Sequence, residues 1–196
     1  MILTSAFDPS LRLILEPLPY VGLLEKRPLS QIDLVVMHCT ELPDMAMARE
    51  YGERVLYEAG TGASGHYYID RDGSIHEYVN PAHIANHTKG FNPRSIGIEL
   101  VNIGRYPNWY DADKQLMTEA YTAEQISSLK KLLLLLKFAC PDLQFIAGHE
   151  DLDTAVVPAT DDPDKTVFRK RDPGPLFPWQ EILAAVELKQ ITQVTP

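Results

Sequence analysis

The run Ile32-Asp33-Leu34-Val35-Val36-Met37-His38 decides the fold, because it is a β-branched and apolar stretch that ends on a histidine. A second run, Phe145-Ile146-Ala147-Gly148-His149, has the same form much later in the chain. Short apolar runs of this composition predict strands. Each histidine therefore stands at the carboxyl end of a predicted strand, where α/β sheets place their functional side chains.

Further strands are predicted between these two runs. Residues 66–69 lead through the turn signal Asp70-Arg71-Asp72-Gly73 into residues 74–79, a pattern that predicts a β-hairpin. Within that hairpin, His76 is expected to be exposed. Residues 95–101 alternate small or polar with apolar side chains and predict another strand.

Three segments have the signals of helices. Good helix formers follow Asp44, a suitable N-cap residue. Residues 122–125 form a capping box, and apolar residues then recur at helical spacing up to residue 139. A last helix is expected to start after Pro178. Because strands and helices interleave without a strict βαβ repeat, we expect an α/β (α+β) fold in which helices flank a central mixed β-sheet.

Length and composition indicate one domain over residues 1–196. The chain has 196 residues, of which 45% are hydrophobic, and this suffices for one well-buried core. Two cysteines, Cys39 and Cys140, do not form a disulfide framework in a chain of this length. Both are expected to be buried and reduced.

Charge and hydropathy exclude several classes of protein. The formal net charge of -9 and a pI of about 5.1 argue against a nucleic-acid partner, which requires a basic face. No stretch approaches a membrane span, and the first residues do not resemble a signal peptide. We therefore expect no membrane association and a cytoplasmic location. The common metalloprotease, structural zinc, serine hydrolase and nucleotide motifs are also absent.

His38, His149 and Asp172 form a candidate metal site if the fold brings them together. Two imidazoles and one carboxylate fill three tetrahedral positions on Zn²⁺ and leave the fourth for water, as in catalytic zinc sites. Such an ion acidifies the bound water and polarises a carbonyl. Each residue alone also has an ordinary interpretation, as a hydrogen-bonded histidine at a strand end or as an aspartate that starts a turn.

Two further residues have the chemistry that a hydrolase site requires. Glu99 stands among apolar neighbours, where burial would raise its pKa towards neutrality and suit it to proton transfer. A solvent-facing glutamate on an edge strand is the equally weighted alternative. Lys170, near Asp172, would stabilise the charge of a tetrahedral transition state, or else be a solvated surface charge. For His87 the alternatives are a pocket-lining donor, with His66 beneath it, and a structural role.

Six segments in a fixed order resemble the zinc-dependent N-acetylmuramoyl-L-alanine amidase family, which includes a cell-wall recycling amidase, phage amidase lysozymes and peptidoglycan recognition proteins. The resemblance covers about residues 32–190, and residues 1–30 are expected to be an N-terminal extension packed on the core. The six segments are residues 36–38, 66–73, 86–87, 95–100, 148–151 and 170–175.

The resemblance implies a site and a reaction. His38, His149 and Asp172 would bind one zinc ion per chain, Glu99 would act as acid and base, and Lys170 would stabilise the oxyanion. The implied reaction hydrolyses the amide between the lactyl group of N-acetylmuramic acid and L-alanine in muropeptides, during cell-wall recycling. No obligate protein partner is implied. Candidate substrate-binding residues are His66, His87, Arg94, Arg169 and Arg171.

Two features depart from the family pattern. Asn86 stands where an aromatic residue is frequent, and residues 153–168 form a longer segment than in compact members, suggesting a lid or a substrate-selecting loop. Three alternatives remain: a non-catalytic peptidoglycan-binding module, a phage-type endolysin, and an amidase or peptidase for an unrelated amide. Because competent residues fill all three ligand positions, the hydrolase is favoured over the binding module. Without an export signal or a wall-binding module, soluble muropeptides suit the chain better than intact wall.

Overall fold

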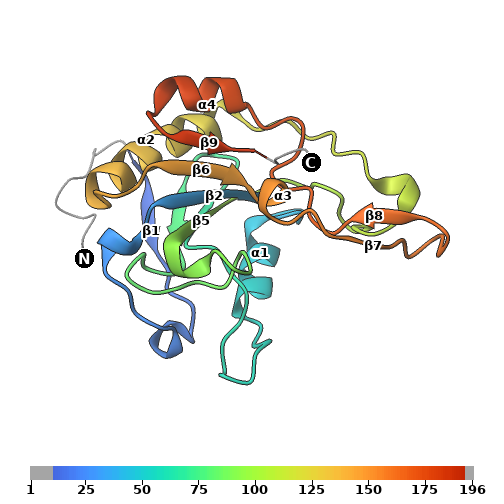
Figure 1. Cartoon of the computed structure of the whole chain (residues 1–196), viewed down its shortest axis with the longest axis horizontal. Coiled ribbons are helices and arrows are strands. Elements are labelled where there is room, and N and C mark those ends of the chain that lie inside the picture. Colours follow the sequence, from blue (N-terminus) through green and yellow to red (C-terminus); the bar gives the residue numbers. More distant parts are fainter. Residues whose placement is uncertain (1–10, 193–196) are drawn as a thin grey trace.

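A computed structural model describes residues 11–192, in which seven strands form one mixed sheet in the order β1-β4-β3-β5-β2-β6-β9 (Figure 1). Strands β3 and β4 pair antiparallel, as the predicted hairpin requires, and the other neighbours in this sheet run parallel. The predicted mixed sheet is therefore confirmed. The strands are Leu13–Leu15 (β1), Leu34–Cys39 (β2), Tyr67–Ile69 (β3), Ile75–Glu77 (β4), Ser95–Leu100 (β5), Phe145–Gly148 (β6) and Lys189–Ile191 (β9).

The helices begin where their capping residues predict. The Asp44 carboxylate accepts a hydrogen bond from the backbone N–H of Met47 at the start of α1. Thr122 and Gln125 form a complete capping box at the start of α2. No helix within residues 11–192 is long and apolar enough to cross a membrane. The α-helices are Met45–Glu53 (α1), Ala123–Ala139 (α2), His149–Leu152 (α3) and Trp179–Ala185 (α4), and the 3-10 helices are Val21–Leu23 (η1), Leu29–Gln31 (η2), Asn92–Arg94 (η3) and Ala112–Lys114 (η4).

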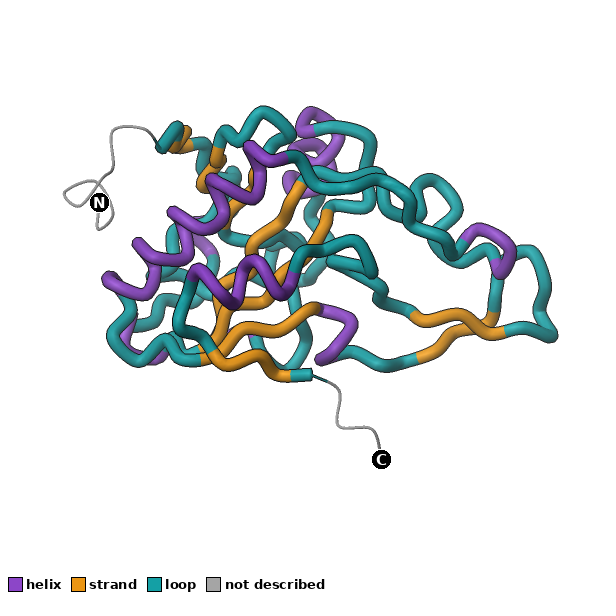
Figure 2. The backbone as a smooth tube through the Cα atoms, turned by 90° about the horizontal axis from the view of Figure 1, so that it is seen from above, coloured by secondary structure: helices purple, strands orange, loops and turns teal. Residues whose placement is uncertain are grey.

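One face of the sheet forms the main hydrophobic core beneath α2 and α4, which lie on the same side of the sheet (Figures 1 and 2). Met37 and Ile98 project from β2 and β5 into this core, where Leu129 and Leu132 of α2 are fully buried. Burial of such a side chain contributes about 1.5–3 kcal/mol relative to exposure. This packing holds β2 and β5 in place, and with them the side chains that the two strands present on the opposite face of the sheet.

The opposite face of the same strands has polar side chains at its carboxyl edge. In the parallel register His38 pairs with Glu99, and Glu99 pairs with Tyr68. Because successive strand residues point to opposite faces, these three side chains share the face away from α2. Glycine is required at one point there, since a Cβ atom on Gly97 would lie 2.6 Å from the His87 ring. Helix α1 lies on this side, with Ala48 packed in a second apolar cluster.

Two chain excursions project from the carboxyl side of the sheet, and we call them together the arm: residues 103–118 and residues 153–168. The second contains an antiparallel ribbon of β7 (Val156–Pro158) and β8 (Thr166–Phe168), which extends away from the body in Figures 1 and 2. The excursions contact one another, because Thr160 N–H donates to the Tyr110 carbonyl at 2.9 Å and Ala112 N–H donates to Asp161 at 2.6 Å. The segment expected to be long is thus an ordered ribbon.

The described part of the N-terminal extension packs on the sheet. Strand β1 pairs with β4, and Leu18 and Tyr20 are buried. Residues 1–10 of the predicted extension lie outside the described residues. Cys39 and Cys140 are buried and are not joined in a disulfide, as expected.

One expectation for the hairpin is wrong. His76 was predicted to be exposed, yet its side chain is only 13% exposed and its Nδ1 lies 3.0 Å from Glu16 Oε2. Alternation along the strand did not indicate this, because the N-terminal extension covers that edge of the sheet.

Candidate metal centre and catalytic site

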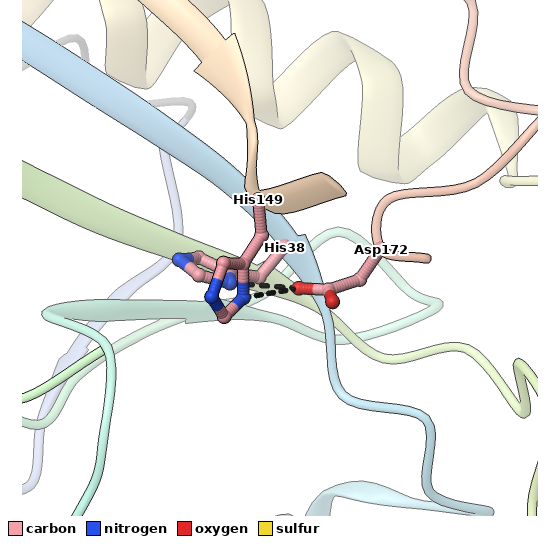
Figure 3. A group of neighbouring side chains, drawn as sticks. All are labelled: His38, His149 and Asp172. Carbon is pink, nitrogen blue, oxygen red and sulfur yellow. Dashed lines mark hydrogen bonds and ion pairs between the residues drawn. The ribbon is translucent and has the colours of Figure 1, made fainter. Parts of the chain in front are cut away.

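The three candidate metal ligands meet at the carboxyl edge of the sheet. The register pairs Met37 with Gly148, the last residue of β6, so His38 and His149, the first residue of α3, follow next to each other. Asp172 comes from the irregular segment after β8 and points at both rings (Figure 3). Its Oδ2 atom lies 2.8 Å from Nδ1 of His38 and 3.0 Å from Nδ1 of His149. One candidate ligand atom from each residue falls within 4.8 Å of the others.

The chemistry of these residues fits a divalent metal ion. Burial and the neighbouring His149 lower the pKa of His38 to about 4, so its imidazole is neutral, the form that binds metals. Burial alone would raise the pKa of Asp172, but its contacts with His149 and His38 hold it well below the usual range. The second carboxylate oxygen, Oδ1, is buried without a hydrogen-bond partner among the described residues. An unsatisfied buried acceptor costs about 1–3 kcal/mol, which a bound cation would offset. Two imidazole nitrogens and one carboxylate suit Zn²⁺.

Glu99 lies beside this cluster and has little exposure to solvent. Its side chain is 15% exposed, and Oε1 lies 3.9 Å from Nδ1 of His38. Burial, followed by the nearby Asp172 carboxylate, raises the pKa of Glu99 to about 8, although Lys170 opposes this shift. The alternative of a solvent-facing glutamate is therefore excluded. A carboxyl group with this pKa can both accept and return a proton near neutral pH.

A cavity of about 330 Å³ opens over these groups. Three cations line it, and two are engaged: Arg105 binds Glu41, and Arg169 pairs with Asp153. Among the described residues, Lys170 has no hydrogen-bond or ion-pair partner. Its ammonium lies close enough to lower the pKa of both Glu99 and Asp172. Lys170 is thus the cation of this cavity that is available to a bound molecule.

The two histidines proposed for substrate binding differ in position. His87 lines the cavity, and its Nδ1 lies 3.1 Å from Nε2 of His38. His66 lies beneath it, fully buried, with its ring centroid 5.6 Å from that of His87. The Nδ1 atom of His66 accepts from the Gly97 N–H at 3.0 Å. The sequence-based expectation is corrected for His66, which supports the wall of the cavity from behind.

The three arginines proposed for substrate binding also differ in whether they line the cavity. Arg94 stands directly before β5, at the opposite end of that strand from Glu99, and pairs with Asp33. It lies outside the cavity, which corrects the expectation that it contacts substrate. Arg171 is half-buried and does not line the cavity, whereas Arg169 does. Arg169, Lys170 and Asp172 line the cavity, and the sequence contains no signal that Arg171 does not.

Several residues of the cavity were not identified from sequence. Glu41 and Arg105 form a buried pair at its edge, and Trp109 of the arm donates its indole N–H to the Glu41 carbonyl at 3.1 Å. Asn86, noted as a departure from the family pattern, also lines the cavity and donates to the Gly62 carbonyl at 3.1 Å. The positions of Glu41, shortly after His38, and of Arg105, shortly after Glu99, were the available signal.

Comparison with known proteins places this geometry in a family. Residues 28–175 match the family model described as N-acetylmuramoyl-L-alanine amidase. An endolysin of Enterobacteria phage T3 is 25% identical over 137 residues, which are 69% of this chain and 85% of that protein.

Solved structures agree in fold. A crystal structure of an AmpD derivative has a TM-score of 0.66 and 24% identity, covering 95% of this chain and 99% of that chain. AmpDh3 from Pseudomonas aeruginosa, in complex with an anhydromuramic pentapeptide, has a TM-score of 0.60 and 26% identity, covering 82% of this chain and 61% of that chain. Since the family model spans most of the sequence, the chain belongs to the N-acetylmuramoyl-L-alanine amidase family.

Proposed function

We propose that this chain is a zinc-dependent amidase that cleaves the bond between the lactyl group of N-acetylmuramic acid and L-alanine in soluble muropeptides. The observation that carries the proposal is the convergence of His38, His149 and Asp172 at a cavity that Glu99 and Lys170 also line. The anhydromuramic pentapeptide bound to the related AmpDh3 supports this substrate class.

The two histidines and Asp172 would hold one zinc ion per chain. When bound, zinc supplies a Lewis acid that polarises the scissile carbonyl and lowers the pKa of a water ligand. The neutral state of His38 and the ionised state of Asp172 keep these side chains ready to act as ligands.

Glu99 would move the proton. It takes a proton from the attacking water and later returns it to the departing amine of L-alanine, so the same carboxyl serves first as base and then as acid. Its Oε1 atom lies 3.9 Å from Nδ1 of His38, so Glu99 would be adjacent to a water held at this cluster. Burial maintains a pKa at which both transfers are accessible.

Lys170 would stabilise the oxyanion. As the carbonyl carbon becomes tetrahedral, negative charge develops on its oxygen, and a preorganised cation in a partly desolvated site stabilises that charge. Arg169 lines the same cavity but is paired with Asp153, which leaves Lys170 for this role.

A role in cell-wall recycling, with action in the cytoplasm, is the finer part of the proposal. The alternative is an endolysin, and the relative from phage T3 favours testing it directly. Purified zinc-loaded protein should be incubated with defined anhydro and reducing muropeptides and, separately, with intact sacculi. Release of free stem peptide from muropeptides, read by mass, supports recycling, and faster release from sacculi supports the endolysin. Tight binding without release would show a recognition module.

A further inference from the structure

Arg105 makes hydrogen bonds with its whole guanidinium group. Its side chain is 1% exposed, and Nε and Nη2 donate to the two carboxylate oxygens of Glu41 at 2.7 and 2.8 Å. The other donors reach Oε1 of Gln115 at 3.1 Å and the backbone carbonyls of Phe168 at 2.9 Å and Arg169 at 3.4 Å. These contacts account for all five N–H groups that an arginine has.

The partners of Arg105 belong to two parts of the site. Glu41 stands two residues beyond the end of β2, the strand that holds His38. Phe168 ends β8, and Arg169 directly precedes Lys170. Arg105 therefore links the carboxyl edge of the sheet to the irregular segment that carries the cavity's available cation.

The hydrogen bonds of Arg105 orient the segment that carries Lys170 more than they add to the stability of the fold. A buried ion pair contributes little net stability, because desolvation of the charges opposes their attraction. The planar arginine fork, by contrast, fixes the geometry of the groups it binds. Lys170 has no side-chain partner among the described residues, so the direction of its ammonium depends on the path of its backbone.

We propose that Arg105 is a positioning residue for catalysis: through Glu41 and the carbonyls of Phe168 and Arg169, it holds the Lys170 ammonium over the reacting carbonyl. The inference rests on the role proposed for Lys170. The indole of Trp109 adds to the same anchor, because it donates to the Glu41 carbonyl.

The first test is Arg105→Lys, which keeps the charge and loses the fork. We expect kcat to fall about 10- to 100-fold, since small displacements of a catalytic group have effects of this size. KM should change by less than about threefold, and zinc content should stay at the wild-type level. A matched control is Arg71→Lys, because Arg71 binds Glu119 through Nε and Nη2 at 2.6 and 3.0 Å but does not contact residues 168–170. Wild-type kcat is expected for this control.

A double-mutant cycle separates positioning from general damage. If Arg105 acts through Lys170, then Arg105→Lys in a Lys170→Ala background should lower kcat by less than about threefold. Losses that multiply would overturn the proposal. Inactivity of the wild-type protein would instead overturn the proposed function, so the two failures are distinguishable.

A spectroscopic measurement tests the same inference without turnover. In protein with ¹³C-labelled lysine, the Lys170 Cε signal is assigned by its absence in Lys170→Arg. We expect this signal to move towards a mobile, solvent-exposed position in Arg105→Lys and to stay in place in Arg71→Lys. An unchanged Lys170 signal in folded Arg105→Lys would contradict the proposal. If Arg105→Lys does not fold, Glu41→Gln carries both measurements, because glutamine keeps one acceptor for Arg105 at nearly the same volume.

Discussion

The site joins two regions that are fixed in different ways. His38 and Glu99 stand on adjacent parallel strands, and His149 directly follows the last residue of the neighbouring strand β6, so the register brings the three together. Lys170 and Asp172 come from an irregular segment, whose position depends on Arg105 and on contacts of the arm. The comparison teaches that the sheet positions the proposed base and two of the candidate ligands, while the segment positions the proposed cation and the third candidate ligand.

The sheet region derives its rigidity from the hydrophobic core. The same strands that present His38 and Glu99 on one face bury Met37 and Ile98 on the other, beneath α2. Among the described residues, residues 169–172 belong to none of the hydrophobic clusters, and hydrogen bonds hold them in place. Substitutions of the site side chains in either region should therefore act on the chemistry directly, whereas substitutions of the groups that hold the segment, such as Arg105, should act through position.

The largest effect is expected from Glu99→Ala. Removal of the proton carrier should lower kcat by about 10²- to 10⁴-fold, because general acid and base catalysis contributes on that scale. Zinc content, measured by mass spectrometry of the metal, should not change, since Glu99 is not among the three ligands. Near-normal turnover in this variant would show that another residue transfers the proton.

Lys170→Ala tests the segment in the same assay. Loss of one preorganised oxyanion donor should lower kcat by about 10²-fold, with zinc retained. Arg169→Ala serves as the control, because Arg169 is paired with Asp153 and should affect kcat far less. If Arg169→Ala showed the larger loss, the assignment of the catalytic cation would be reversed.

The pH dependence of stability reports on the burial of Glu99. Its pKa is raised from 4.5 to about 8 in the folded protein, so the folded state binds more protons than the unfolded state between these values. Stability of the metal-free protein should therefore fall as the pH rises from about 4.5 to about 8, by on the order of 5 kcal/mol from this group. Urea titrations at several pH values should show the slope, and Glu99→Gln should reduce it to the part that remains from groups such as Glu150, whose pKa burial raises to about 7. An identical slope in that variant would show that groups other than Glu99 produce the pH dependence.

The smallest effect is expected from Arg94→Ala. The pair with Asp33 lies far from the cavity and is partly exposed, with 40% of the arginine side chain accessible. Solvent screening limits such a pair to about 1 kcal/mol of stability or less. Both kcat and KM should stay within about twofold of wild type. A large rise in KM would indicate that Arg94 contacts the substrate, contrary to its position in the structure.

Local patterns predicted most of the fold and the sheet-borne part of the site. The capping residues Asp44 and Thr122 act on their own helices, and strand-end histidines meet whenever their strands are neighbours, so both follow from short stretches of sequence. Side-chain direction was harder to predict. His66 is covered by His87, and Arg94 stands at the end of β5 away from the cavity. Both placements depend on strand register and on neighbours from elsewhere in the chain.

The arm could not be predicted from periodicity. Its residues combine short strands, one 3-10 helix and irregular turns, and none of these has a repeating apolar pattern long enough to identify. The buried pair of Glu41 and Arg105 was missed because their positions shortly after His38 and Glu99 place each residue near the site but do not indicate that the two will be buried together.

The central claim is that the two regions assemble one metal centre, and zinc stoichiometry tests it most directly. Wild-type protein loaded with zinc and freed of excess metal should retain about one ion per chain, and Asp172→Ala should retain far less, because one of three ligands is lost. Circular dichroism would confirm that the variant is folded. Full zinc stoichiometry in folded Asp172→Ala would contradict the account, since the segment would then contribute no ligand to the centre.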